Sequence, residues 1–335
     1  MPLDSYFDPE GSGGAVGIAR DGEDAFLDVI GFGDIDARSP ITSRTSFDLA
    51  SVTKVFTGTA AMLLGERGQL RISDPIAQYL PGIKQPSGHR PVLIQDLLWH
   101  ISDIPDYLAA AAQDESFEFL PESVRKWACG RVPSAEPGQR DEYSNTNYFL
   151  LAEIISEVAG MSYADFLRTN LFEPFGLSDT FVLGHHREHT VRARGYQNVR
   201  IGIPGYQRSE FDLPVLGDGG VFSSIRDLLR WQELYYGGHV LKPATLAQAL
   251  RPGTLDCGTT LGYGCGVMVE DLGDGRRWCG HDGAWSGAAA FLGRWVEDCL
   301  SVVVLSNDQH AQVARIAQRS LAAWRRRQSN KPQIA

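Results

Sequence analysis

The sequence lacks the features that mark several classes of protein. Its longer apolar stretches, such as 288–292 and 300–305, fall far short of the roughly 18 residues that a membrane-spanning helix needs. The N-terminus has neither a basic segment nor an apolar one, so nothing in it predicts export. Cysteine is scarce, and the five residues, without a C-x-x-C pair, fit a reducing compartment better than a disulfide framework. We therefore expect a cytoplasmic protein with no membrane partner.

Basic residues are fewer than acidic ones. The 335 residues include 31 Lys and Arg against 41 Asp and Glu, which gives a formal net charge of −10. Such a chain has no broad cationic face to neutralise phosphates, so we expect no nucleic-acid partner. The rest of the composition is that of a globular protein, with 43% hydrophobic and 21% charged residues, long enough for about two domains.

The spacing of apolar residues changes along the chain. Short strands are predicted near the N-terminus and again toward the C-terminus, at 15–20, 25–30, 262–270, 276–279, 288–296 and 300–305. Between these regions helices predominate, at 53–67, 94–100, 148–158, 163–170, 225–235 and 243–250, and a last helix is predicted at 309–326.

This order predicts an α/β (α+β) fold. Strands from both ends of the chain would form one antiparallel sheet flanked by helices, and a mostly helical domain would be inserted between them. The predicted sheet domain comprises residues 1–50 and 255–335, and the helical domain comprises 51–254. We expect the functional site at the seam between the two.

The strongest candidate for chemistry is Ser51-Val52-Thr53-Lys54 at the start of a predicted helix. Residues three apart lie on the same helical face, so the Lys54 amine can reach the Ser51 hydroxyl. This pairs a nucleophile with its base, provided that the pKa of Lys54 falls by about three units from its usual value near 10.4.

Three further segments carry polar groups suited to such a site. Tyr143-Ser144-Asn145 follows a turn, and its Tyr could share a proton with Ser51 and Lys54. Asn145 could hydrogen-bond either a substrate carbonyl or Lys54. The other segments are His281-Asp282-Gly283 at the edge of a strand and the glycine-rich turn 218–220.

In combination, these residues resemble the penicillin-recognising serine hydrolases, in particular the branch of class C β-lactamases, DD-peptidases, family VIII esterases and D-aminopeptidases. The three motifs of that superfamily are S-x-x-K, Y-x-N and [KH]-x-G. Here they occur in order as Ser51/Lys54, Tyr143/Asn145 and His281/Gly283. The stretches 96–105, 137–145 and 172–177 also look like segments of that branch. The resemblance spans roughly residues 15 to 310 and implies a β-lactamase/transpeptidase-like fold.

The resemblance also implies an acyl-enzyme mechanism. Ser51 would attack a carbonyl, while Lys54 and Tyr143 relay protons as general base and then general acid. The backbone N–H groups of Ser51 and Ala284 would form the oxyanion hole. His281 stands where class C β-lactamases have Lys, and it would keep the network of Ser51 and Tyr143 polar.

One departure from the superfamily pattern narrows the expected substrate. Carboxylate-recognising members usually have Thr or Ser where this chain has Asp282, whose charge would repel a substrate carboxylate. We therefore expect a serine hydrolase for small esters or D-configured amides, with Asn145, Asp282 and Gly283 contacting the substrate. The alternatives are an acyltransferase that uses the same acyl-enzyme, a β-lactamase or DD-carboxypeptidase, and a non-catalytic protein that binds a ligand. The sequence leaves the oligomeric state open.

Neither a cofactor nor a metal ion is expected. His185, His186 and His189 could hold a metal if they were helical, but their polar neighbours favour a loop. The spacing of Cys257, Cys265 and Cys279 fits no usual zinc pattern.

Overall fold

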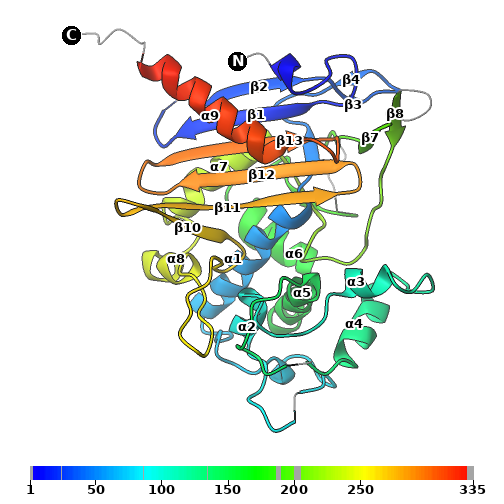
Figure 1. Ribbon diagram of the computed structural model, residues 1–335, viewed down its shortest axis with the longest axis vertical. Helices are drawn as coiled ribbons and strands as arrows, with labels where there is room; N and C mark the ends of the chain where they lie inside the picture. The colour runs from blue at the N-terminus through cyan, green and yellow to red at the C-terminus, as the bar shows by residue number, and fades with distance from the viewer. Residues whose placement is uncertain are drawn as a thin grey trace.

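Figure 1 shows the protein as a computed structural model, in which a broad sheet lies above a group of helices. The structure describes residues 3–329 except 24, 86, 134, 186–189 and 200–204.

An antiparallel sheet joins the two ends of the chain. Within the described residues it has six strands in the order β10-β11-β12-β13-β1-β2. Their bounds are β10 Met268–Gly273, β11 Arg276–Trp285, β12 Ala288–Trp295, β13 Leu300–Ser306, β1 Gly14–Arg20 and β2 Phe26–Ile30. The two ends of the chain meet where β1 pairs with β13, in a register that sets Gly14 opposite Ser306. The prediction of one antiparallel sheet built from both termini is confirmed.

Both faces of this sheet are buried, which explains the nearly unbroken apolar run of β13. Val302 and Val304 belong to one apolar cluster, and Val303 and Leu305 to the other. Because successive side chains of a strand point to opposite faces, each face needs its own cover. On one face the cover is α9 (Val313–Ser329), which crosses the front of the sheet in Figure 1.

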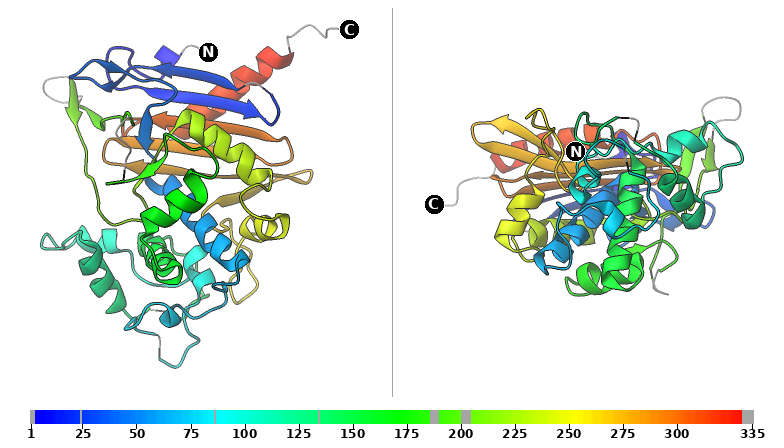
Figure 2. Two further views of the ribbon diagram at one scale, coloured as in Figure 1. Left: turned by 180° about the vertical axis from the view of Figure 1, so that it is seen from behind. Right: turned by 90° about the horizontal axis from the view of Figure 1, so that it is seen from below.

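The opposite face is covered by helices from the middle of the chain. α7 (Ile225–Tyr236) packs directly on β1 and β13 and is seen from behind in Figure 2. α1 (Thr53–Glu66) is buried over most of its length and packs against α5 (Asn145–Ala159). The remaining α-helices are α2 Ile94–Leu98, α3 Tyr107–Ala111, α4 Pro121–Cys129, α6 Tyr163–Leu167 and α8 Pro243–Ala249.

Short elements fill the junction between the sheet and the helices. β5 (Ser46–Asp48), β9 (Val221–Ser224) and β6 (Phe181–Val182) form a small sheet beside the start of α1. Two strand pairs lie elsewhere, β3 Phe32–Asp34 with β4 Ser39–Pro40 and β7 Tyr196–Val199 with β8 Gly205–Arg208. Single turns of helix are η1 Leu3–Ser5, η2 Ala50–Val52, η3 Ile76–Gln78 and the wider turn η4 Arg168–Phe172.

The strand predicted at 262–270 is wrong in its first part. β10 begins only at Met268, because Gly266 has a φ of +83° that breaks the extended backbone. A Cβ at Gly266 would lie 2.1 Å from the Lys54 carbonyl oxygen, so this segment packs tightly on the first turns of α1. The preceding residues therefore support α1 instead of the sheet.

The helical segment predicted as a separate domain also contributes to the cover of the sheet. α7 falls inside the predicted helical domain 51–254 and nevertheless covers the sheet. The boundaries at residues 50 and 254 stay a prediction. In the described part of the chain, no helix has the length and apolar character needed to cross a bilayer.

Candidate active site

Ser51 lies in η2, the tight turn between β5 and α1. The turn is held by two hydrogen bonds, from Ala50 N–H to Asp48 Oδ1 at 2.8 Å and from Leu49 N–H to the Val221 carbonyl at 3.0 Å. Ala50 has a φ of +46°, a conformation that a residue with a side chain adopts only at a cost in free energy. The local fold therefore fixes Ser51 at the head of a buried helix.

Lys54 follows one helical turn later and points back at Ser51. Its Nζ lies 3.2 Å from Ser51 Oγ, 2.9 Å from Asn145 Oδ1 and 2.9 Å from the Asp218 carbonyl oxygen. The side chain is fully buried. Burial lowers the pKa of Lys54 to about 8, and the charges of Asp218 and Asp106 oppose that shift. A useful fraction of this amine is therefore neutral near pH 7 and able to accept the Ser51 proton.

Tyr143 reaches Ser51 from the opposite side. Its hydroxyl donates to Ser51 Oγ at 3.1 Å, and its ring lies over Lys54 Nζ, 5.0 Å from the centroid. Burial of the hydroxyl raises the pKa of Tyr143, although the residue as a whole is 45% exposed. Tyr143 is therefore a neutral phenol at physiological pH, suited to give a proton and poorly suited to take one.

Asn145 is the first residue of α5. Its Oδ1 accepts from Lys54, and its Nδ2 donates to Asp106 Oδ2 at 2.9 Å. Of the two partners left open by the sequence, the structure places Lys54 against the amide oxygen. Asn145 thus orients the amine and also contributes to the wall of the pocket.

His281 lies on β11, behind Tyr143. Burial and the charge of Lys54 lower the pKa of His281 to about 3, so the ring is neutral. Nδ1 donates to the Asp282 carbonyl at 2.5 Å, which leaves Nε2 to accept from the Tyr263 hydroxyl at 2.9 Å. Among the described residues, neither ring nitrogen hydrogen-bonds Ser51 or Tyr143, and the His281 ring meets that of Tyr143 only by packing, with centroids 6.4 Å apart.

Gly283 allows β11 to lie directly against the Ser51 turn. A Cβ at this position would be 2.5 Å from the Leu49 carbonyl oxygen and 2.9 Å from Ser51 N. Ala284, the next residue, lines the same pocket as Ser51. The structure therefore brings together the two backbone segments expected to form an oxyanion hole.

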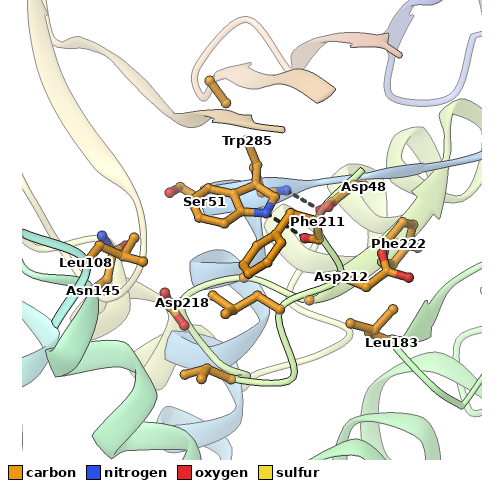
Figure 3. A pocket seen from close by; sticks show the side chains of 16 residues that line it. Asp48, Ser51, Leu108, Asn145, Leu183, Phe211, Asp212, Asp218, Phe222 and Trp285 are labelled. Atoms are coloured by element: carbon orange, nitrogen blue, oxygen red, sulfur yellow. Dashed lines mark hydrogen bonds between the residues drawn. The ribbon is translucent and has the colours of Figure 1, made fainter. Parts of the chain in front are cut away.

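A pocket of about 650 Å³, counting the space at its open mouth, adjoins Ser51 (Figure 3). Most of its side chains are apolar: Ala50, Leu108, Leu183, Phe211, Leu213, Val215, Phe222, Ala284 and Trp285. Its charged side chains are all acids, Asp48, Asp212 and Asp218. Arg192 lies beside the pocket, but its guanidinium is paired with Asp212.

Asp282 contributes differently from the expectation. The residue is exposed and does not line this pocket. Its charge nevertheless raises the pKa of Tyr143, so Asp282 lies within electrostatic range of the site. The acidic character of the pocket itself comes from Asp48, Asp212 and Asp218.

Several residues of the site were not singled out from the sequence as functional. His100 is buried, and its ring packs against that of Tyr143 with centroids 4.4 Å apart and planes tilted by 31°. It lies in the stretch 96–105 that resembles the superfamily, which was the available signal. Asp218 belongs to the glycine-rich turn noted in the sequence, whereas Phe211 and Trp285 gave no signal.

No cluster of three or more His, Cys, Asp or Glu side chains suited to hold a metal ion occurs among the residues that the structure describes. His186 and His189 of the histidine segment lie outside the described residues.

The chain is similar to several known proteins. The family model described as Beta-lactamase matches residues 3–323. Penicillin-binding protein 4* of Bacillus subtilis (strain 168) is 28% identical over 327 residues, which cover 88% of this chain and 68% of that protein. The D-aminopeptidase of Brucella anthropi is 27% identical over 311 residues, which cover 89% of this chain and only 56% of that protein.

Two solved structures have the same fold. The octameric penicillin-binding protein homologue from Pyrococcus abyssi has a TM-score of 0.82 and 26% identity, covering 95% of this chain and 74% of that one. The D-amino acid amidase from Ochrobactrum anthropi SV3, complexed with L-phenylalanine, has a TM-score of 0.73 and 24% identity, covering 88% of this chain and 87% of that one. The second likeness concerns the fold alone.

Proposed function

Because the chain belongs to the beta-lactamase family and is a serine hydrolase, we propose that it cleaves amides or esters through an acyl-enzyme on Ser51. One observation carries the proposal. Ser51 Oγ lies 3.2 Å from Lys54 Nζ and 3.1 Å from the Tyr143 hydroxyl, on the wall of an open pocket. A serine with both a base and an acid within reach is equipped for acyl transfer.

The two partners of Ser51 differ in proton affinity, which assigns their roles. Neutral Lys54 accepts the Ser51 proton as Oγ bonds to the substrate carbonyl carbon, and the oxyanion forms against the N–H groups of Ser51 and Ala284. Tyr143 then gives its proton to the leaving nitrogen or oxygen as that bond breaks, and Lys54 returns a proton to Tyr143. This leaves neutral Lys54, a phenol and the acyl-enzyme. Water releases the acid by the same steps in reverse.

The pocket supports a substrate without a carboxylate beside the scissile bond. Its charged lining groups are acids, and the guanidinium of Arg192 is already taken by Asp212. A neutral ester or an amine-bearing amide fits this surface better than a β-lactam antibiotic or a peptide with a C-terminal carboxylate. The D-aminopeptidase relative supports amides, and D-configured amides in particular. We therefore propose D-amino-acid amides and small esters as substrates.

Intact-mass spectrometry tests the proposal directly. The protein is incubated separately with a p-nitrophenyl ester, D-alanyl p-nitroanilide and a chromogenic cephalosporin. We expect turnover of the ester or the anilide and a transient adduct of the acyl mass, absent from Ser51→Ala. Turnover by Ser51→Ala at the native rate would disprove the role of Ser51, and an adduct with the cephalosporin alone would disprove the substrate class.

A further inference from the structure

The carboxyl group of Asp218 is buried beside Lys54 and only half satisfied. The residue is 5% exposed. Its Oδ2 accepts from the Tyr107 hydroxyl at 2.8 Å, whereas Oδ1 is buried without a hydrogen-bond partner among the described residues. The main-chain oxygen of the same residue accepts from Lys54 Nζ at 2.9 Å. A buried carboxyl with one oxygen unpaired is costly, which calls for an explanation.

The glycines around Asp218 fix this position. Gly217 has a φ of +106° and Gly220 a φ of +92°, conformations that other residues rarely adopt. A Cβ at Gly217 would lie 2.4 Å from the Tyr148 carbonyl oxygen, so the loop is pressed onto α5. Thr57 on α1 donates to the Gly217 carbonyl at 2.6 Å. Asp218 is therefore held against both helices of the site by a rigid turn.

The groups that face Lys54 come from several elements. The titratable ones are Asp106 before α3, His100 after α2, His281 on β11, Tyr143 and Tyr148 around α5, and Asp218. Burial lowers the pKa of both histidines and raises that of both tyrosines, so all four are neutral near pH 7. The charges facing Lys54 are thus those of the two aspartates.

Of the two aspartates, Asp218 has the stronger electrostatic effect on Lys54. Its charge opposes the effect of burial on the pKa of Lys54 more strongly than the charge of Asp106 does. Asp106 is partly exposed, so solvent screens its charge more than that of Asp218. Burial raises the pKa of Asp218, whereas the positive charge of Lys54 and the hydrogen bond from the Tyr107 hydroxyl oppose that shift and favour the ionised carboxylate.

We propose that Asp218 is a positioning residue whose carboxylate holds the proton on Lys54 and so sets the lowest pH at which Ser51 can be activated. The inference rests on the proposed role of Lys54 as the base. The unpaired oxygen is explained because a carboxylate that acts through its charge needs no direct hydrogen bond to the amine.

NMR titration of Lys54 tests this inference without relying on turnover. The chain has five lysines, so ¹³C-lysine labelling gives few Cε signals, and Lys54→Arg identifies the relevant one. Asp218→Asn removes the charge and keeps the shape. We expect it to lower the pKa of Lys54 by about one unit from its native value, because a nearby opposite charge favours the protonated amine by that order.

A matched control is Asp274→Asn, which removes one negative charge at an exposed turn in the β10–β11 hairpin. We expect no shift of Lys54 in this variant. Tyr107→Phe removes the donor that keeps Asp218 ionised, and we expect a smaller downward shift. Tyr107→Phe also tests the inference if Asp218→Asn does not fold.

The pH dependence of kcat/KM should move with the NMR value in each variant, with the acid limb of Asp218→Asn about one unit lower. An unchanged Lys54 titration in folded Asp218→Asn, or an upward shift in Tyr107→Phe, would overturn the inference. If the native protein forms no acyl-enzyme on Ser51, the proposed function is overturned. The NMR titration of Lys54 does not depend on acylation, so the two failures can be told apart.

Discussion

Gly283→Ala is the substitution whose effect on the site follows most directly from distances. The added Cβ would stand 2.5 Å from the Leu49 carbonyl oxygen and 2.9 Å from Ser51 N. Ordinary contacts of a Cβ begin at 3.4 Å, so the strand and the Ser51 turn must separate by 3.4 − 2.5 = 0.9 Å or distort. That separation opens the gap between the two backbone segments of the proposed oxyanion hole.

The expected loss is set by that displacement. A misplacement of about 1 Å in a catalytic group costs on the order of 10²-fold in rate. Removing one oxyanion donor costs about as much, 10²–10³-fold in kcat. We therefore expect kcat to fall about 100-fold, with a smaller change in KM because the pocket wall is otherwise intact.

The assay is steady-state hydrolysis of the best ester or anilide, with the rate of Ser51 labelling by a fluorophosphonate measured in parallel. Gly262→Ala is the matched control, because its Cβ meets only the Val269 carbonyl oxygen at 3.8 Å. Thermal unfolding of both variants separates a local effect from a loss of fold. Native kcat in folded Gly283→Ala would refute the reasoning.

Three other changes should have measurable effects. The value of kcat/KM should rise as the pH increases through about 8, because neutral Lys54 is the base and only about a tenth of it is neutral at pH 7. A flat profile of kcat/KM from pH 6 to 9 would contradict this role of Lys54. Tyr143→Phe should lower kcat by at least about 10²-fold, since it removes the proton donor to the leaving group, and single-turnover kinetics would show whether acylation slows. Asp21→Ala should lower the free energy of unfolding, measured in urea, by about 3 kcal/mol, because it leaves the buried charge of Arg294 without its acidic partner. The double variant Asp21→Ala with Arg294→Met should recover most of that stability. A double variant as unstable as Asp21→Ala would contradict the reasoning.

The part of the site that the sequence predicts is the part set by local spacing or by motif order. Ser51 in η2 and Lys54 in the first turn of α1 are three residues apart on a continuous helical path, so their contact follows from helical geometry. Tyr143 and His281 are far away in sequence; their chemistry made them candidates, and the motif order of a known superfamily indicated that they lie near Ser51. The antiparallel sheet could be predicted because apolar strands occur at both ends of the chain.

The remaining features depend on tertiary packing. The hydrogen bond of His281 to Tyr263 and the burial of Asp218 beside Tyr107 join segments whose spacing has no periodic signal. The late start of β10 depends on the positive φ of Gly266, which is needed only because that glycine packs on α1. Repulsion of a substrate carboxylate was expected from Asp282, whereas the acids that line the pocket are Asp48 at the end of β5 and Asp212 and Asp218 between β8 and β9.

The pairing of β1 with β13 also dictates an order of events during synthesis. β1 is made early and can pair with β2 at once, but its other edge has no partner until β13 leaves the ribosome. Until then an apolar strand edge is exposed, which favours aggregation and slows folding through late, long-range contacts. β11, which carries Gly283 and Ala284, is also made late. We therefore expect the nascent chain to hold Ser51 and Lys54 in a helix long before it has an oxyanion hole, so that catalytic competence arises only with closure of the sheet.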